Sequence, residues 1–171
     1  FDFIRERGNA LEDYDLERMA KDIDDASSWI EDRFGSRPTS FAYPCGQTFV
    51  GRGTGTQSYV PLIAERFLAG RLFASERAAP PRYVDLAQVF SLDIDRIEPE
   101  DAIRRLDENF AAGHWIILTG HEVAPDHGQG ILPVTLNAIC QWARKKGDEL
   151  WMDTVGSIAS HIKTLQENHH D

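Results

Sequence analysis

Hydrophobic residues recur along the chain with helical and extended spacings, and the alternation of the two predicts a fold class. The clearest helical stripe covers 16–34, where apolar residues return every three or four positions. Asp15 is a suitable N-cap for this helix and Gly35 a suitable end. The remaining pattern predicts helices at 58–68, 100–110, 134–144 and 154–162, and strands at 40–43, 71–74, 83–90, 115–119 and 149–152. Alternating strands and helices are typical of a mostly parallel α/β sheet, open or curled into a barrel.

Composition limits the partners of this predicted single α/β domain, residues 1–171. The chain holds 18 Lys+Arg against 28 Asp+Glu, a net charge of −10, whereas binding along a phosphate backbone needs a basic surface. We therefore expect no nucleic acid as partner. No apolar run approaches the ~20 residues of a membrane-spanning helix, so we expect no membrane span. Two cysteines, Cys45 and Cys140, are too few for a disulfide framework or a thiolate zinc site.

The first candidate site is the segment Tyr43-Pro44-Cys45-Gly46, which follows a predicted strand. Active sites of α/β folds collect at the carboxyl ends of strands. Proline fixes φ and glycine permits a tight turn, so backbone N–H groups here could point outward and hold an oxyanion. An ordinary strand-ending turn is the alternative. We expect the Cys45 thiol to be a small buried side chain rather than a nucleophile, and the Tyr43 ring could face a sugar or belong to the core.

The second candidate is His121, two residues past the most apolar predicted strand, 115–119. An imidazole at that edge of the sheet can act as a general acid or base, and a hydrogen-bonded structural histidine is the alternative. His114 precedes the same strand and so lies at its opposite end. No histidine pair in the chain has a ligand spacing such as His-x-x-x-His, so the sequence predicts no metal site of its own.

A glycine-rich segment, Gly51-Arg52-Gly53-Thr54-Gly55, could cradle a phosphate. It lacks the Lys-Ser/Thr of a nucleotide-binding loop, and no helix is predicted directly at its last glycine. A flexible loop is therefore the favoured interpretation. A nucleotide-binding α/β domain remains a distant alternative that rests on this segment alone.

Three segments in a fixed order resemble the polysaccharide deacetylase family, also described as NodB-like or carbohydrate esterase family 4. They are FAYPCG at 41–46, LTGHE at 118–122 and WMDTVGSIA at 151–159, and the resemblance covers nearly all of the chain. It implies a distorted (β/α) barrel of the deacetylase type. It also implies removal of acetyl groups from N-acetylated or O-acetylated carbohydrate with a divalent metal, zinc being the expected ion, in a secreted or periplasmic protein.

The resemblance also implies roles for single residues. The backbone N–H of Cys45 would help to bind the tetrahedral oxyanion, and Tyr43, Pro44 and Gly46 would line the substrate beside it. His121 would match the histidine that protonates the departing amine or alcohol. Both assignments agree with the strand-end argument made from the residues themselves.

Some parts of the family pattern have no counterpart here. The family's early Asp-Asp motif and the histidine pair that binds the metal would precede Phe1, so we expect the N-terminal strands and the metal ligands to be missing from this chain. Ala42 stands where many members have an arginine that supports the catalytic base. The leading hypothesis is the C-terminal portion of a metal-dependent carbohydrate deacetylase that is inactive as this chain alone. An inactive carbohydrate-binding pseudoenzyme is the alternative, and self-association into a homo-oligomer stays open.

Overall fold

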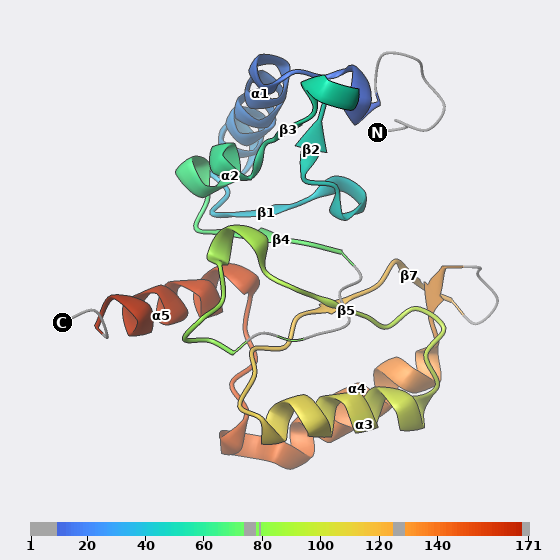
Figure 1. The fold of residues 1–171 in the computed structure, drawn as a ribbon. Helices are drawn as coiled ribbons and strands as arrows, with labels where there is room; N and C mark the ends of the chain where they lie inside the picture. Colours follow the sequence, from blue (N-terminus) through green and yellow to red (C-terminus); the bar gives the residue numbers. More distant parts are fainter. Residues whose placement is uncertain (1–9, 74–77, 79, 125–128, 169–171) are drawn as a thin grey trace.

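A computed structural model describes residues 10–73, 78, 80–124 and 129–168 (Figure 1). Its helices are α1 (Leu16–Phe34), α2 (Val60–Arg66), α3 (Pro99–Ala111), α4 (Pro133–Lys146) and α5 (Val155–Glu167). Its strands are β1 (Ser40–Ala42), β2 (Phe49–Val50), β3 (Gln57–Ser58), β4 (Ala69–Arg71), β5 (Leu92–Asp93), β6 (Leu118–Thr119), β7 (Glu122–Val123) and β8 (Gly130–Ile131). Within this described part, no helix is both long and apolar enough to cross a bilayer.

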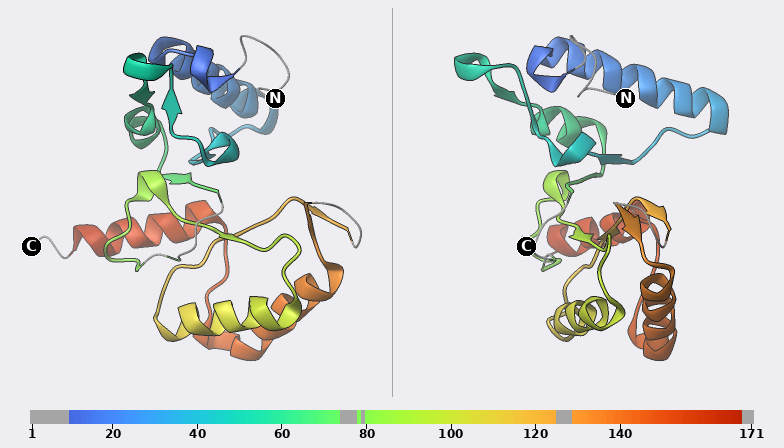
Figure 2. Two further views of the ribbon diagram at one scale, coloured as in Figure 1. Left: turned by 45° about the vertical axis from the view of Figure 1, so that its right-hand side comes forward. Right: turned by 90° about the vertical axis from the view of Figure 1, so that its right-hand side faces the viewer.

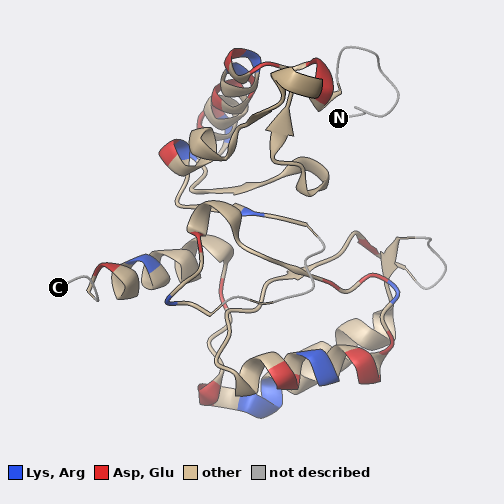
Figure 3. Cartoon of the chain, viewed as in Figure 1, with Lys and Arg blue, Asp and Glu red and all other residues tan. Residues whose placement is uncertain are grey.

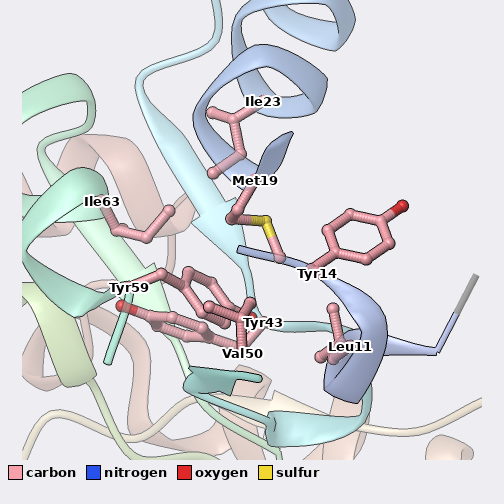
Figure 4. Close-up of a cluster of buried hydrophobic side chains, with 8 residues drawn as sticks. All are labelled: Leu11, Tyr14, Met19, Ile23, Tyr43, Val50, Tyr59 and Ile63. Carbon is pink, nitrogen blue, oxygen red and sulfur yellow. The ribbon is translucent and has the colours of Figure 1, made fainter. Parts of the chain in front are cut away.

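Helix α1 confirms the predicted bounds. The Asp15 side chain accepts a hydrogen bond from the Arg18 backbone N–H at 2.8 Å, and Gly35 ends the helix with a left-handed φ of 78°. Met19 and Ile23, on the predicted apolar stripe, are buried. They pack into a cluster with Tyr43 and other side chains of the N-terminal half of the chain (Figure 4).

Three of the four described strand pairs are parallel. β1 pairs with β4, β5 with β6 and β7 with β8, whereas β2 and β3 form an antiparallel hairpin. A parallel bridge between Arg71 and Val89 also links β4 to the segment that leads into β5. Among the described residues these pairs do not join into a closed barrel, and the deacetylase-type barrel stays a prediction.

Helices cover the paired strands from several sides (Figures 1 and 2). The β1–β4 pair lies between α1 and α2 on one side and α5 on the other. Helices α3 and α4 lie side by side and pack against β5 and β6. The Trp142 indole N–H and the Lys146 ammonium group both reach the Asp107 carboxylate, which ties α4 to α3. Charged residues concentrate on the helices (Figure 3), with Glu100 and Asp101 in the first turn of α3, where the helix dipole favours acids.

Two predicted strands are wrong. Within 83–90 the chain forms a 3₁₀ turn, Leu86–Gln88, because the Asp85 side chain accepts the Ala87 backbone N–H at 2.9 Å and caps it. Within 149–152 the chain leaves another 3₁₀ turn, Gly147–Glu149, and continues without a strand partner in the described residues. A third strand, predicted at 71–74, is displaced toward the N-terminus.

Gly70 explains that displacement. The sequence predicts that Gly70 ends the preceding helix, but α2 already ends at Arg66 and Gly70 lies inside β4. A Cβ built on Gly70 would lie 2.5 Å from the Ala87 carbonyl oxygen. Glycine is therefore required here by a close approach of two backbone segments rather than by a helix end.

Candidate functional site

His121 is held by one carboxylate through two hydrogen bonds. Its backbone N–H donates to Asp95 Oδ1 at 3.0 Å, and its ring Nδ1 is hydrogen-bonded to Asp95 Oδ2. The Asp95 side chain is only 7% exposed, whereas the His121 side chain is 44% exposed. Nε2 is thus the ring nitrogen that Asp95 does not hold, on a side chain that solvent and ligands can reach.

Strand register brings these two residues together. Asp93 of β5 pairs with Thr119 of β6, so the residues two positions beyond each strand end lie side by side. The Asp93 side chain also accepts the Asp95 backbone N–H at 2.9 Å and fixes the turn after β5. The carboxylate that orients His121 therefore comes from the neighbouring strand end.

The Asp95 carboxyl is ionised at neutral pH. Burial raises its pKa, but the hydrogen bonds from the His121 side chain and backbone, and the charges of His121 and Arg96, outweigh burial and bring the pKa below its usual value. An ionised carboxylate can only accept a hydrogen bond, so Nδ1 carries the proton that it shares with Asp95. The pair therefore suits proton transfer through Nε2.

Gly120 makes the close packing at this strand end possible. A Cβ at this position would lie 2.5 Å from Ile131 Cγ1 and 3.1 Å from Asp95 Oδ1. A side chain on residue 120 would therefore push against the carboxylate that holds His121.

The Pro44–Gly46 turn presents its backbone at the end of β1. Gly46 N–H donates to the Tyr43 carbonyl at 2.9 Å and Gln47 N–H to the Pro44 carbonyl at 3.0 Å. Cys45 lies between them, with a left-handed φ of 50°, and its N–H forms no hydrogen bond within the described part of the chain. The expectation of a buried Cys45 thiol is wrong, because this turn leaves the residue exposed.

Phe73 contacts both candidate segments. Its ring meets the His121 ring edge to face, with centroids 5.6 Å apart. Its backbone and Cβ lie 3.1 to 3.3 Å from the position of a Cβ built on Gly46, so a side chain at residue 46 would press against Phe73. The strand end at His121 and the Pro44–Gly46 turn, far apart in the sequence, therefore both adjoin Phe73, the first through its ring and the second through its backbone and Cβ.

Strained backbone occurs in both candidate segments. Among the described residues, the non-glycine residues with positive φ are Cys45, at 50°, and Arg96, at 54°, the residue after Asp95. The Arg96 N–H donates to the Gly130 carbonyl at 2.9 Å, which ties the strained residue to β8. Strained backbone is often found where a site needs a group in a fixed direction.

The Tyr43 ring belongs to the core. The residue is 2% exposed, and its hydroxyl donates to the Ala87 carbonyl at 2.8 Å (Figure 4). Burial, and then the charge of Asp85, raise the pKa of this hydroxyl. Only the backbone of Tyr43 remains to face a substrate. Pro44 and Gly46 are partly buried, and their substrate contacts stay a prediction.

The glycine-rich segment is the connection of a hairpin. Gly53–Gly55 forms a 3₁₀ turn between the antiparallel strands β2 and β3, and the Arg52 guanidinium binds Asp13 at 2.8 Å. A phosphate cradle would need a strand, a loop and a helix that begins at the loop. The nucleotide-binding alternative therefore has no structural support from this segment.

A divalent metal does not fit the described residues by themselves. They contain no group of three or more His, Cys, Asp or Glu side chains placed to hold an ion. His127, His169 and His170 lie outside the described residues.

Sequence reasoning identified His121 and the Pro44–Gly46 turn but missed Asp95, Phe73 and Arg96. The sequence signal for Asp95 is limited to the two acids of LDID at 92–95. Its partner could not be inferred without the pairing of β5 with β6.

Known proteins do not add to this geometry. Comparison of the chain with protein-family models, with curated proteins and with solved structures finds no significant match. The chemistry of the site therefore rests on the His121–Asp95 pair and the turn beside it.

Proposed function

We propose that this chain carries the proton-donor and oxyanion-binding side of a hydrolase that removes acetyl groups from N-acetylated or O-acetylated carbohydrate. The observation that carries the proposal is the exposed His121 imidazole hydrogen-bonded to the buried Asp95 carboxylate at a strand end. The resemblance of segments 41–46, 118–122 and 151–159 to polysaccharide deacetylases supports the same conclusion.

In this proposal each group has one task. When the tetrahedral intermediate collapses, the doubly protonated His121 gives its Nε2 proton to the departing nitrogen or oxygen, as the bond from that atom to the acetyl carbon breaks. Asp95 stabilises the positive ring before the transfer and fixes its direction. The Cys45 N–H donates a hydrogen bond to the oxyanion and so stabilises the negative charge of the tetrahedral intermediate.

A divalent metal would supply the activated water. The described residues hold no ligand set for it, so the ligands of the proposed enzyme would be contributed by other residues of the protein.

Carbohydrate binding without catalysis is the second candidate function. It would use the same strand ends and would need no titrating group. A buried aspartate that fixes one ring nitrogen of an exposed histidine favours the enzyme, because simple binding gains little from a fixed proton position.

The test is His121→Ala in the protein that carries this chain, assayed on an N-acetylated oligosaccharide. Turnover should fall by roughly 10²–10⁴-fold, while substrate affinity and melting temperature change little. Asp95→Asn should lower turnover by a smaller factor, roughly 10–100-fold, as outer partners of a working histidine do.

The matched control is His161→Ala, which removes an exposed imidazole from α5. It should leave turnover unchanged. A His121→Ala protein that keeps full turnover, or loses it only in proportion to its unfolded fraction, contradicts the proposal. Saccharide binding by a wild-type protein without turnover supports the binding module instead.

A further inference from the structure

Arg71 ends β4 at the same edge as the candidate site. It is in register with Ala42 of β1, the strand that leads into the Pro44–Gly46 turn. Side chains in register on parallel strands extend to the same face, and residues two apart on one strand share a face. Arg71 therefore shares a face with the buried Ala69 and has only the methyl group of Ala42 beside it across the strand pair.

The backbone around Arg71 is fixed. Leu72 N–H donates to the Val89 carbonyl at 2.9 Å, and the Ser91 hydroxyl donates to the Leu72 carbonyl at 2.7 Å. Phe73, one residue further, contacts both His121 and Gly46. The Arg71 side chain is therefore attached to a fixed backbone, two residues before Phe73.

The charge of Arg71 is not neutralised within the described residues. The guanidinium is partly buried, donates to the Leu72 carbonyl at 3.1 Å, and has no described carboxylate within 4.0 Å. Burial lowers the pKa of Arg71, whereas Arg66, at the end of α2, has its pKa raised chiefly by a hydrogen bond to Asp24. A partly buried cation without an anion is unfavourable unless a ligand completes it.

We infer that Arg71 binds a carboxylate at the candidate site through its guanidinium fork. This inference rests on the proposed function. The planar fork of arginine matches a carboxylate with two parallel hydrogen bonds. Two sources of that carboxylate fit the proposed reaction: the acid group of a uronic-acid type substrate, or the carboxylate base that activates water and is contributed by other residues of the protein.

Arg71→Gln tests the inference and separates the two sources. Steady-state kinetics would be measured on an acetylated oligosaccharide of uronic acids and on a neutral acetylated oligosaccharide. If the substrate supplies the carboxylate, KM for the acidic substrate should rise at least roughly tenfold while the neutral substrate is unaffected. If the catalytic base supplies it, kcat should fall on both substrates and the acidic limb of the pH–rate profile should move to higher pH, because a carboxylate that loses a neighbouring cation has a higher pKa.

Arg71→Lys and Arg105→Gln complete the design. Lysine keeps the positive charge but lacks the two parallel N–H donors, so Arg71→Lys should restore only part of what Arg71→Gln loses. Arg105→Gln makes the same charge change on an exposed position of α3 and should leave both substrates unaffected. Unchanged kinetics and pH profile in Arg71→Gln, or equal effects of Arg105→Gln, overturn the inference.

A binding experiment keeps this inference apart from the proposed enzyme. Sodium acetate and glucuronate would be titrated into the chain while the side-chain Nε–H resonance of Arg71 is followed by NMR. A saturable shift that Arg71→Gln removes supports the carboxylate site even if no acetylated sugar is turned over. If neither probe gives a saturable shift and Arg71→Gln leaves the kinetics of an active enzyme unaltered, Arg71 does not bind a carboxylate.

Discussion

At the scale of single residues, Asp95 decides what His121 can do. The carboxylate is buried, holds both the backbone N–H and the ring Nδ1 of His121, and directs Nε2 away from itself. His121 was predicted from its place after an apolar strand. Asp95 was not, because its role depends on which strand lies next to β6, and hydrophobic spacing carries no information about strand order.

Asp95→Asn should reveal the ionised carboxylate through the pH dependence of stability. The pKa of Asp95 is lowered in the folded protein, so its contribution is fully present above the unfolded value of about 3.9 and is lost as pH falls through the lower folded pKa. We expect the difference in free energy of unfolding between wild type and Asp95→Asn to be largest near neutral pH and to shrink below about pH 4.

Urea denaturation across a pH series measures that difference. Asp148→Asn, at an exposed position of the turn after α4, is the control and should show no such change with pH. A difference between wild type and Asp95→Asn that stays constant from acid to neutral pH would mean that the carboxylate is not held as described.

At the scale of elements, long helices were predictable and short strands only in part. Helix α1 has a sustained apolar stripe and clear end signals, and its bounds agree with the sequence. Strands β4 and β5 are three and two residues long, too short for a period of two to be distinguished from a turn, whereas β1 and β6 lie within the predicted strands 40–43 and 115–119. Close backbone contacts and a side-chain cap, at Gly70 and Asp85, decide the local structure there.

Gly70→Ala tests the packing that places β4. The added Cβ would meet the Ala87 carbonyl oxygen at 2.5 Å and the side chains of Ile63 and Tyr43 at 2.9 Å. A backbone carbonyl cannot rotate away as a flexible side chain can, so we expect a loss of about 1–3 kcal/mol in the free energy of unfolding.

Thermal and urea unfolding give the value. Gly55→Ala is the matched control, because a Cβ there meets no atom within 4 Å, and its stability should stay within about 0.5 kcal/mol of wild type. Equal stability of the Gly70 and Gly55 variants would show that β4 does not lie against the Ala87 segment.

At the scale of the whole molecule, the candidate site forms where strand ends from different hydrophobic clusters meet. Phe41 of β1 packs in the cluster with α1 and α2, whereas Ala69 of β4 packs in a second cluster with α5. Leu118 of β6 and Ile94, which follows β5, pack in a third cluster with α3 and α4. Phe73 links the strand end at His121 to the Pro44–Gly46 turn by contacting both. The sequence predicted each half of this site, but the contact between the halves depends on three-dimensional packing that no local pattern records.

The described surface also carries exposed apolar side chains, including Trp151 at 52% and Met152 at 71% exposure. They follow the turn after α4, where a strand was predicted and none is formed. Self-association and the deacetylase-type barrel both remain predictions for this molecule.

If His121 gives a proton to the leaving group, the effect of His121→Ala must depend on how much that group needs the proton. In the protein that carries this chain, turnover of an N-acetylated sugar and of an aryl acetate would be measured side by side. An amide nitrogen needs a proton to depart and an aryl oxide does not, so we expect a loss of roughly 10²–10⁴-fold on the amide and a much smaller loss on the ester. Equal losses on both substrates, together with a lower melting temperature, would show that His121 is a structural residue and not the proton donor.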